Sequence, residues 1–236
     1  MAQRQLIYFA DPMCSWCWGF SPVIERIAAK YGDELPITVV LGGLRAGNTI
    51  PMDQAMKDDI QSHWRHVSER TGQPFDHSFF DRDGFVYDTG PACRAVVAAR
   101  RAQPGCELAF LKTLHEAFYK EAIDLTDGSK LMQIARDFGF AGEQFSQAFA
   151  GEGCSRELAG DFRLVLENGI RAFPALLGGT REDRFMAITH GYKSFEELEP
   201  SLERLLTAKT LPQGLMPGAP PGAGQSGGSC DLDGKF

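Results

Sequence analysis

Residues 9–20 read FADPMCSWCWGF, and this stretch decides how the rest of the chain is interpreted. Its two cysteines, Cys14 and Cys17, are three positions apart and come soon after residues 5–10, an apolar run typical of a buried central strand. An Asp-Pro pair ends that run, and the residues after the cysteines carry apolar side chains at helical spacing. The stretch therefore predicts a strand followed by a C-x-x-C pair at the first turn of a helix.

The position of this pair at a helix start has a direct chemical consequence. Unpaired N–H groups and positive potential at a helix N-terminus stabilise a thiolate, which predicts a pKa for Cys14 below the value of about 8.5 for a free thiol. Such a thiolate attacks a disulfide, and Cys17, one turn later on the same helix face, resolves the mixed disulfide by forming the Cys14–Cys17 bond. The motif therefore predicts Cys14 as the attacking thiol and Cys17 as the resolving thiol of a thiol–disulfide oxidoreductase.

Two other interpretations of the pair are open. A C-x-x-C motif can supply half of a structural zinc site, but such a site needs four ligands, and the sequence has no second C-x-x-C to complete it. His63 and His66 are three residues apart on an expected helix, without a clear third ligand. The pair could also be two inert cysteines of the core. We expect no metal site and no organic cofactor.

Strand and helix patterns continue outward from the motif. Residues 37–41 are rich in β-branched side chains and predict a second strand, parallel to the first because a helix connects the two. Helical spacing then covers residues 52–70, 91–102, 107–120, 129–138, 143–149 and 155–167. Strand character returns only after this helical block.

The C-terminal part predicts a hairpin and a last helix. Residues 175–177 and 184–188 flank a Gly-Gly-Thr segment, residues 178–180, which favours an antiparallel hairpin with this segment in its turn. Ser194 and Glu197 form a capping-box pattern at the start of the final helix.

Charge and composition argue against several classes of partner. The net charge is −7 and no stretch is strongly basic, which argues against binding to nucleic acid or to an anionic membrane surface. No apolar run approaches the length of a membrane span, and the first residues lack the pattern of a secretory signal. We therefore expect a cytoplasmic protein, whose six cysteines stay reduced rather than forming three structural disulfides.

A second signal lies immediately before the third expected strand, where residues 171–174 read RAFP. Proline at the opening of a strand is tolerated for its missing N–H and means little alone. Together with DPMCSWCWGF, however, it makes the chain resemble the DsbA family, and within it the cytoplasmic DsbA-like disulfide isomerases of the FrnE type, over most of residues 5–207. The resemblance implies that Pro174 is a cis proline facing the active site and that Phe173 offers its backbone to an extended substrate strand.

The resemblance also implies the fold and its domains. We expect an α/β, thioredoxin-like fold with a helical insertion. Residues 1–47 and 168–210 would form a discontinuous thioredoxin-like domain, and residues 48–167 the helical insertion. Residues 211–236 are dominated by proline and glycine, and they predict a flexible tail because they cannot bury enough apolar surface to stay ordered.

The implied activity is that of a protein disulfide oxidoreductase or isomerase acting on protein or peptide thiols and disulfides. Glutathione or a thioredoxin-type partner would recycle it. The Ser15-Trp16 dipeptide departs from the Pro-His of periplasmic oxidants, and the uncharged Trp16 predicts a less acidic Cys14 and a weaker oxidant. We expect Trp16 to be partly exposed and to contact the substrate, and Trp18 to belong to the core.

Two rival functions come from other classes. The kappa-class glutathione transferases and chromene-carboxylate isomerases have a similar architecture, but they usually lack the second cysteine, so the presence of Cys17 argues against a glutathione-dependent transferase or isomerase. A chaperone-like binding module with vestigial cysteines is the other alternative.

The remaining candidates have mainly structural interpretations. Asp11 could relay protons, although a strand-end turn residue is the favoured interpretation. Cys93 lies among small apolar residues and predicts a buried, inert thiol. Cys106 and Cys154, near helix starts, are expected to be structural or merely exposed. Cys230, in the tail, is either an incidental exposed thiol or a tethered thiol that reaches Cys14.

Overall fold

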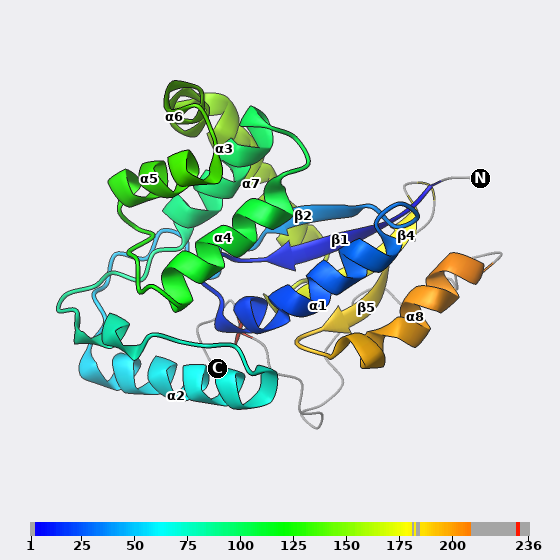
Figure 1. Cartoon of the computed structure of the whole chain (residues 1–236), viewed down its shortest axis with the longest axis horizontal. Helices are drawn as coiled ribbons and strands as arrows, with labels where there is room; N and C mark the ends of the chain where they lie inside the picture. The colour runs from blue at the N-terminus through cyan, green and yellow to red at the C-terminus, as the bar shows by residue number, and fades with distance from the viewer. Residues whose placement is uncertain (1–2, 181, 183–184, 209–229, 232–236) are drawn as a thin grey trace.

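A mixed sheet of four strands forms the centre of the protein in the computed structural model, which describes residues 3–180, 182, 185–208 and 230–231 (Figure 1). The strands are β1 (Arg4–Ala10), β2 (Ile37–Leu41), β4 (Ala175–Thr180) and β5 (Met186–His190), in the order β2-β1-β4-β5. β1 is parallel to β2 and antiparallel to β4, and β4 is antiparallel to β5. The described strands thus form the thioredoxin-like arrangement that the resemblance implied.

The first strand, helix and second strand confirm the sequence prediction. β1 is central and largely buried, as its near-continuous apolar sequence indicated. Helix α1 (Ser15–Tyr31) connects it to β2, which spans the predicted residues and runs parallel to it. Cys14 is the N-cap residue of α1. The end of β1 and the start of α1 therefore place the C-x-x-C pair at one edge of the sheet.

Helices occupy the chain between β2 and the next strand. They are α2 (Gln54–Thr71), the 3₁₀ helix η1 (His77–Asp81), α3 (Gly90–Ala102), α4 (Glu107–Tyr119), α5 (Gly128–Phe138), α6 (Gly142–Ala150) and α7 (Glu152–Glu167). α4 and α2 contact α1, and α7 contacts β2, so this block packs directly on the sheet unit (Figure 1). Its treatment as a separate insertion domain stays a prediction. None of the helices within the described residues is long and apolar enough to cross a membrane.

The last helix, α8 (Phe195–Thr207), begins at the predicted capping box. The Ser194 hydroxyl accepts a hydrogen bond from the Glu197 N–H at 3.3 Å, and the Glu197 carboxylate accepts one from the Ser194 N–H at 2.7 Å. α8 packs against α1, β4 and β5. The sequence pattern therefore located the start of this helix correctly.

The predicted hairpin exists, but its turn was wrongly placed. Residues 178–180 belong to β4, which pairs with β1 as far as Arg4, and the partner strand β5 begins only at Met186. A Cβ atom at Gly178 would lie 2.5 Å from Leu205 Cδ2 of α8. The glycine is therefore explained by the close approach of a helix to a strand, and not by a turn.

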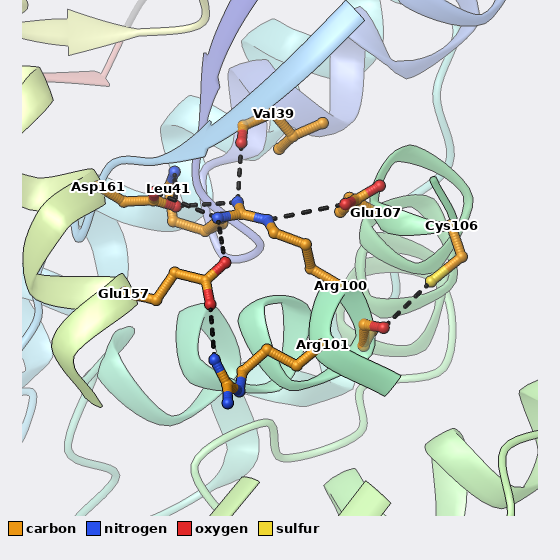
Figure 2. A network of polar contacts seen from close by, with 9 residues as sticks. Val39, Leu41, Arg100, Arg101, Cys106, Glu107, Glu157 and Asp161 are labelled. Atoms are coloured by element: carbon orange, nitrogen blue, oxygen red, sulfur yellow. Dashed lines mark hydrogen bonds and ion pairs between the residues drawn. The ribbon is translucent and has the colours of Figure 1, made fainter. Parts of the chain in front are cut away.

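Two polar side chains cover the free edge of β2, where no further strand pairs within the described sheet (Figure 2). Arg100 of α3 donates to the Val39 carbonyl at 2.8 Å, and the carboxylate of Asp161 in α7 accepts from the Leu41 N–H at 3.0 Å. Arg100 and Asp161 also form an ion pair with an N–O distance of 3.0 Å. The pair joins two helices to the edge of the sheet and satisfies backbone groups that would otherwise be open to another strand.

A second, two-stranded sheet lies beside the first. Its strands are β3 (Ala172–Phe173), which precedes Pro174, and β6 (Cys230–Asp231), drawn in red in Figure 1. They are antiparallel, with Phe173 opposite Cys230 and Ala172 opposite Asp231. These two residues belong to the predicted flexible tail, residues 211–236, whose other residues lie outside the described ones, so the tail stays a prediction.

Candidate active site

The two predicted parts of the site meet at the N-terminal end of α1. The Cys14 thiol lies 3.7 Å from the Phe173 carbonyl oxygen and donates to it. Cys17 follows in the first turn of α1, and neither cysteine forms a disulfide. The Phe173–Pro174 peptide bond is cis, the form that the resemblance implied. Folding therefore brings together two segments that are 159 residues apart in the sequence.

Both thiols are fully buried in this arrangement. The exposed fraction is 0% for Cys14 and 0% for Cys17. Neither residue of the C-x-x-C pair is therefore exposed to solvent in this structure.

The ring of Phe173 is fixed by a glycine that follows β2. A Cβ atom at Gly42 would lie 2.2 Å from the Phe173 ring, and the Gly42 N–H donates to the Ala10 carbonyl at 2.7 Å. The Phe173 side chain is therefore buried against Gly42, whereas the Phe173 backbone pairs with β6. Sequence reasoning missed Gly42, because only the tertiary contact reveals why a side chain is excluded there.

Asp11 anchors the loop that precedes Cys14. Its carboxylate is buried and accepts hydrogen bonds from the Met13 N–H at 2.8 Å and the Leu44 N–H at 2.7 Å. Burial raises the pKa of Asp11, while these bonds and a contact with the Cys93 thiol act in the opposite direction. The carboxylate therefore fixes the end of β1 and the loop after β2, which agrees with the favoured interpretation of Asp11 as a turn residue.

Tyr8 lies next to the dithiol, His115 contacts Asp11 and Ser21, and sequence reasoning did not assign either of them a role. Burial, followed by the negative charge of the Cys17 and Cys14 thiolates, raises the pKa of Tyr8. His115 Nε2 lies 3.1 Å from the Asp11 carbonyl, and its Nδ1 lies 3.1 Å from the Ser21 hydroxyl.

A signal for His115 was present in the sequence. It is four residues after Leu111, on the apolar face of α4, so its burial could have been expected from helical spacing. Tyr8 lies in an apolar strand, where no pattern separates it from the other core residues.

His115 gives the folded protein a specific pH dependence. Burial lowers its pKa from 6.5 to about 4. Between these two values the unfolded chain binds a proton that the folded chain does not, so the free energy of unfolding falls as the pH is lowered from about 6.5 to about 4. The free energy of unfolding of the wild type should fall between pH 6.5 and pH 4 by a few kcal/mol more than that of His115→Gln, which lacks this titrating group.

Urea unfolding of the wild type and of His115→Gln across this pH range provides the measurement. The stability difference between the two proteins should change most between pH 6.5 and pH 4. A constant difference would mean that His115 titrates alike in the folded and unfolded chains.

The structure corrects the expected partial exposure of Trp16 and confirms the expected core position of Trp18. Trp16 is only 3% exposed, because its ring packs against His66 of α2 at 5.6 Å and Tyr192 at 5.9 Å between ring centroids. Trp18 is buried, and its indole N–H donates to the Pro74 carbonyl at 3.0 Å. The contact of Trp16 with a substrate stays a prediction.

The other described cysteines have structural contacts. Cys93 is buried, as expected, and donates to Asp11 at 3.4 Å, and burial raises its pKa. Cys106 donates to the Ala99 carbonyl at 3.5 Å, and burial raises its pKa to about 11. Cys154 donates to the Arg94 carbonyl at 3.5 Å. Neither of these two is exposed. Among the described residues, no group of three or more His, Cys, Asp or Glu side chains could hold a metal ion.

The site has a dithiol at the start of the helix that follows the first strand, and this dithiol faces a Phe-Pro segment. Together with a helical block between the two halves of the sheet, this arrangement defines a class of thioredoxin-like proteins. The chain belongs to the family of the DsbA-like thioredoxin domain, whose model matches residues 5–203. It therefore has the fold of the DsbA-like thiol–disulfide oxidoreductases.

Solved structures of this family are similar along most of the chain. A protein from Nitrosomonas europaea, described as a candidate protein disulfide isomerase, is 35% identical with a TM-score of 0.83, over 88% of this chain and 100% of that one. The cytosolic disulfide reductase DsbM of Pseudomonas aeruginosa is 28% identical with a TM-score of 0.71, over 86% and 98% of the two chains. DsbM has also been solved with glutathione. A 2-hydroxychromene-2-carboxylate isomerase, at 15% identity and a TM-score of 0.60, shares the fold alone.

Curated relatives carry a different description. The ClpXP adapter protein SpxH of Halalkalibacterium halodurans is 25% identical over 177 residues, which are 73% of this chain and 58% of the relative. SpxH of Bacillus subtilis is 22% identical over 199 residues, 82% of this chain and 66% of the relative. The chain thus matches less than two thirds of the length of these two relatives.

Proposed function

We propose that this protein is a thiol–disulfide oxidoreductase in which Cys14 attacks, and Cys17 resolves, the disulfides of protein or peptide substrates. The observation that carries the proposal is the position of Cys14, at the N-cap of α1 and 3.7 Å from the Phe173 carbonyl. The helix N-terminus favours the thiolate, and the strand that precedes Pro174 offers a backbone edge to an extended substrate.

The reaction follows from ordinary thiol exchange. The Cys14 thiolate attacks one sulfur of the substrate disulfide, and the other sulfur leaves as a thiolate that takes up a proton. The deprotonated Cys17 thiol then attacks Cys14, which releases the second substrate thiol and leaves a Cys14–Cys17 disulfide. Two electrons have passed from the dithiol to the substrate. An external thiol returns them by the reverse steps.

Glutathione or a thioredoxin-type protein is the proposed source of those electrons, and the reducing cytoplasm the proposed place of action. The similarity to a cytosolic reductase that was solved with glutathione supports both points. Retention of Cys17 supports a dithiol mechanism over a glutathione-dependent transferase or isomerase, which is the alternative of the kappa-like branch.

Equilibration with defined ratios of reduced to oxidised glutathione tests the proposal. The Cys14–Cys17 pair should interconvert between dithiol and disulfide as one two-electron couple, and the reduced protein should cleave a fluorogenic disulfide peptide with turnover in the presence of glutathione. The proposal is wrong if Cys14 and Cys17 stay reduced at every glutathione ratio, or if the protein cleaves the peptide no faster than glutathione alone.

A binding role that does not need the dithiol is the second candidate, and the similarity to SpxH adapters favours it. The two functions separate in a Cys14→Ser/Cys17→Ser double variant. An oxidoreductase loses its activity in this variant, whereas an adapter or chaperone-like module keeps its binding and its suppression of client aggregation.

A further inference from the structure

We propose that the C-terminal segment around Cys230 is an internal substrate of the active site, and that Cys230 is a third thiol in exchange with Cys14. This inference rests on the proposed function, because it uses the same attacking cysteine and the same backbone edge. It differs in assigning a reactive role to a residue outside the C-x-x-C motif.

The strand pairing supplies the first observation. β6 lies antiparallel on β3, with Cys230 directly opposite Phe173. Phe173 is also the residue whose carbonyl accepts a hydrogen bond from the Cys14 thiol. Phe173 therefore contacts the attacking cysteine through its carbonyl oxygen and also pairs with Cys230 in the two-stranded sheet.

The second observation is that β6 pairs with the edge of β3. β3 is not a member of the four-stranded sheet, and within the described residues its only strand partner is β6. An extended substrate that binds by strand addition needs the N–H and C=O groups of such an edge. The segment at Cys230 thus occupies the position that the proposed function assigns to a client peptide.

The burial of Cys14 supports the same proposal. Cys14 has no exposed surface in the form in which β6 is seated on β3. A client disulfide therefore has to displace part of the structure before it reaches the sulfur. The pairing within the described residues joins two residues to two, and so short a ladder is marginal in water, so a client strand can replace β6 reversibly.

The exchange step balances without another reactant. In the oxidised protein, the thiolate of Cys230 attacks the sulfur of Cys14, the Cys14–Cys17 bond breaks, and Cys17 leaves as a thiolate that takes up a proton. The product has a Cys14–Cys230 disulfide and the same oxidation state. Attack of Cys17 on Cys14 reverses the step. Because Cys230 belongs to the same chain, both directions are unimolecular and compete with external thiols.

The test uses the full chain with the Cys17→Ser substitution, which removes the competing resolving thiol. Glutathione disulfide serves as the oxidant, and peptide mapping after alkylation identifies the partner of Cys14. We expect a Cys14–Cys230 bridge in most molecules, formed with release of two molecules of glutathione per bridge.

A register variant, Cys17→Ser/Ser229→Cys/Cys230→Ser, is the matched control. It keeps one cysteine in the same segment at almost the same distance along the chain. This shift takes the cysteine away from position 230, which is the position that pairs with Phe173. We expect at least about tenfold less bridge than with Cys230, a difference that tethering alone would not produce.

The outcomes separate the two proposals. Equal bridging by the two variants, or Cys14 found only as its glutathione adduct with Cys230 free, overturns the inference while leaving Cys14 reactive. If Cys14 forms neither the bridge nor the glutathione adduct, the proposed function fails as well. A second readout is the rate of peptide cleavage, which should rise in a chain that ends at residue 229, because the β3 edge is then open to the client.

Discussion

Substitution of Cys14 by serine is expected to lower the rate of disulfide cleavage by at least about 1000-fold, because it removes the nucleophile itself. Cys17→Ser is expected to have a different effect. The Cys14 thiolate still attacks, but no second thiol at the helix start resolves the product, so mixed disulfides with clients accumulate, most of all when Cys230 is also replaced by serine and cannot resolve them instead. The position of Cys14 at the N-cap of α1, beside the Phe173 carbonyl, is the reason for this assignment of roles.

The measurement combines peptide cleavage rates with non-reducing electrophoresis and mass spectrometry of trapped adducts. Cys154→Ser is the matched control, since Cys154 is buried and donates to the Arg94 carbonyl at 3.5 Å, a contact that a hydroxyl can replace. It should retain wild-type rates. Trapping of clients by Cys14→Ser, and not by Cys17→Ser, would reverse the two roles.

The second large effect is expected at the edge of β2. Arg100→Ala removes the partner of Asp161, whose side chain is only 7% exposed, and leaves the Val39 carbonyl without its donor (Figure 2). Loss of one partner of a buried ion pair leaves an uncompensated charge, and we expect the free energy of unfolding to fall by about 3 kcal/mol. Burial already raises the pKa of Asp161, and the Arg100 guanidinium opposes that rise.

Arg101 provides the control for Arg100. It is the next residue of α3, its side chain is 43% exposed, and it pairs with Glu157 at 3.1 Å. Arg101→Ala should cost less than about 1 kcal/mol, as is usual for exposed pairs. Urea unfolding of both variants at one pH gives the comparison. Similar losses for the two arginines would show that the contact with Asp161 and β2 contributes little.

Local sequence information was sufficient for the elements around the motif. β1, α1 and β2 were predicted because each is specified by a contiguous pattern: an apolar strand, an Asp-Pro break, a helical repeat and a β-branched run. The capping box at Ser194 and the helices between β2 and β3 were also predicted from local patterns. The observed ends of these helices differ from the predicted ends by a few residues.

Long-range packing limited the remaining predictions. The glycine at position 178 was taken for part of a turn, and it is instead a place where α8 approaches β4 too closely for a side chain. Trp16 was expected to be partly exposed because it lies between two reactive cysteines, but His66 and Tyr192 pack against its ring. Neither partner is near Trp16 in the sequence, so no local pattern contains this information.

The sequence by itself determined the family, the dithiol and its place at the start of a helix, since these depend on residue type and spacing over a few positions. Only the tertiary structure decided that Cys14 faces Phe173, that Tyr8 lies beside the dithiol, that His115 contacts the Asp11 carbonyl, and that Cys230 pairs with the same Phe173. These relations join segments that are far apart along the chain. Their formation depends on how the sheet and helices pack, and a local pattern of residues does not specify that packing.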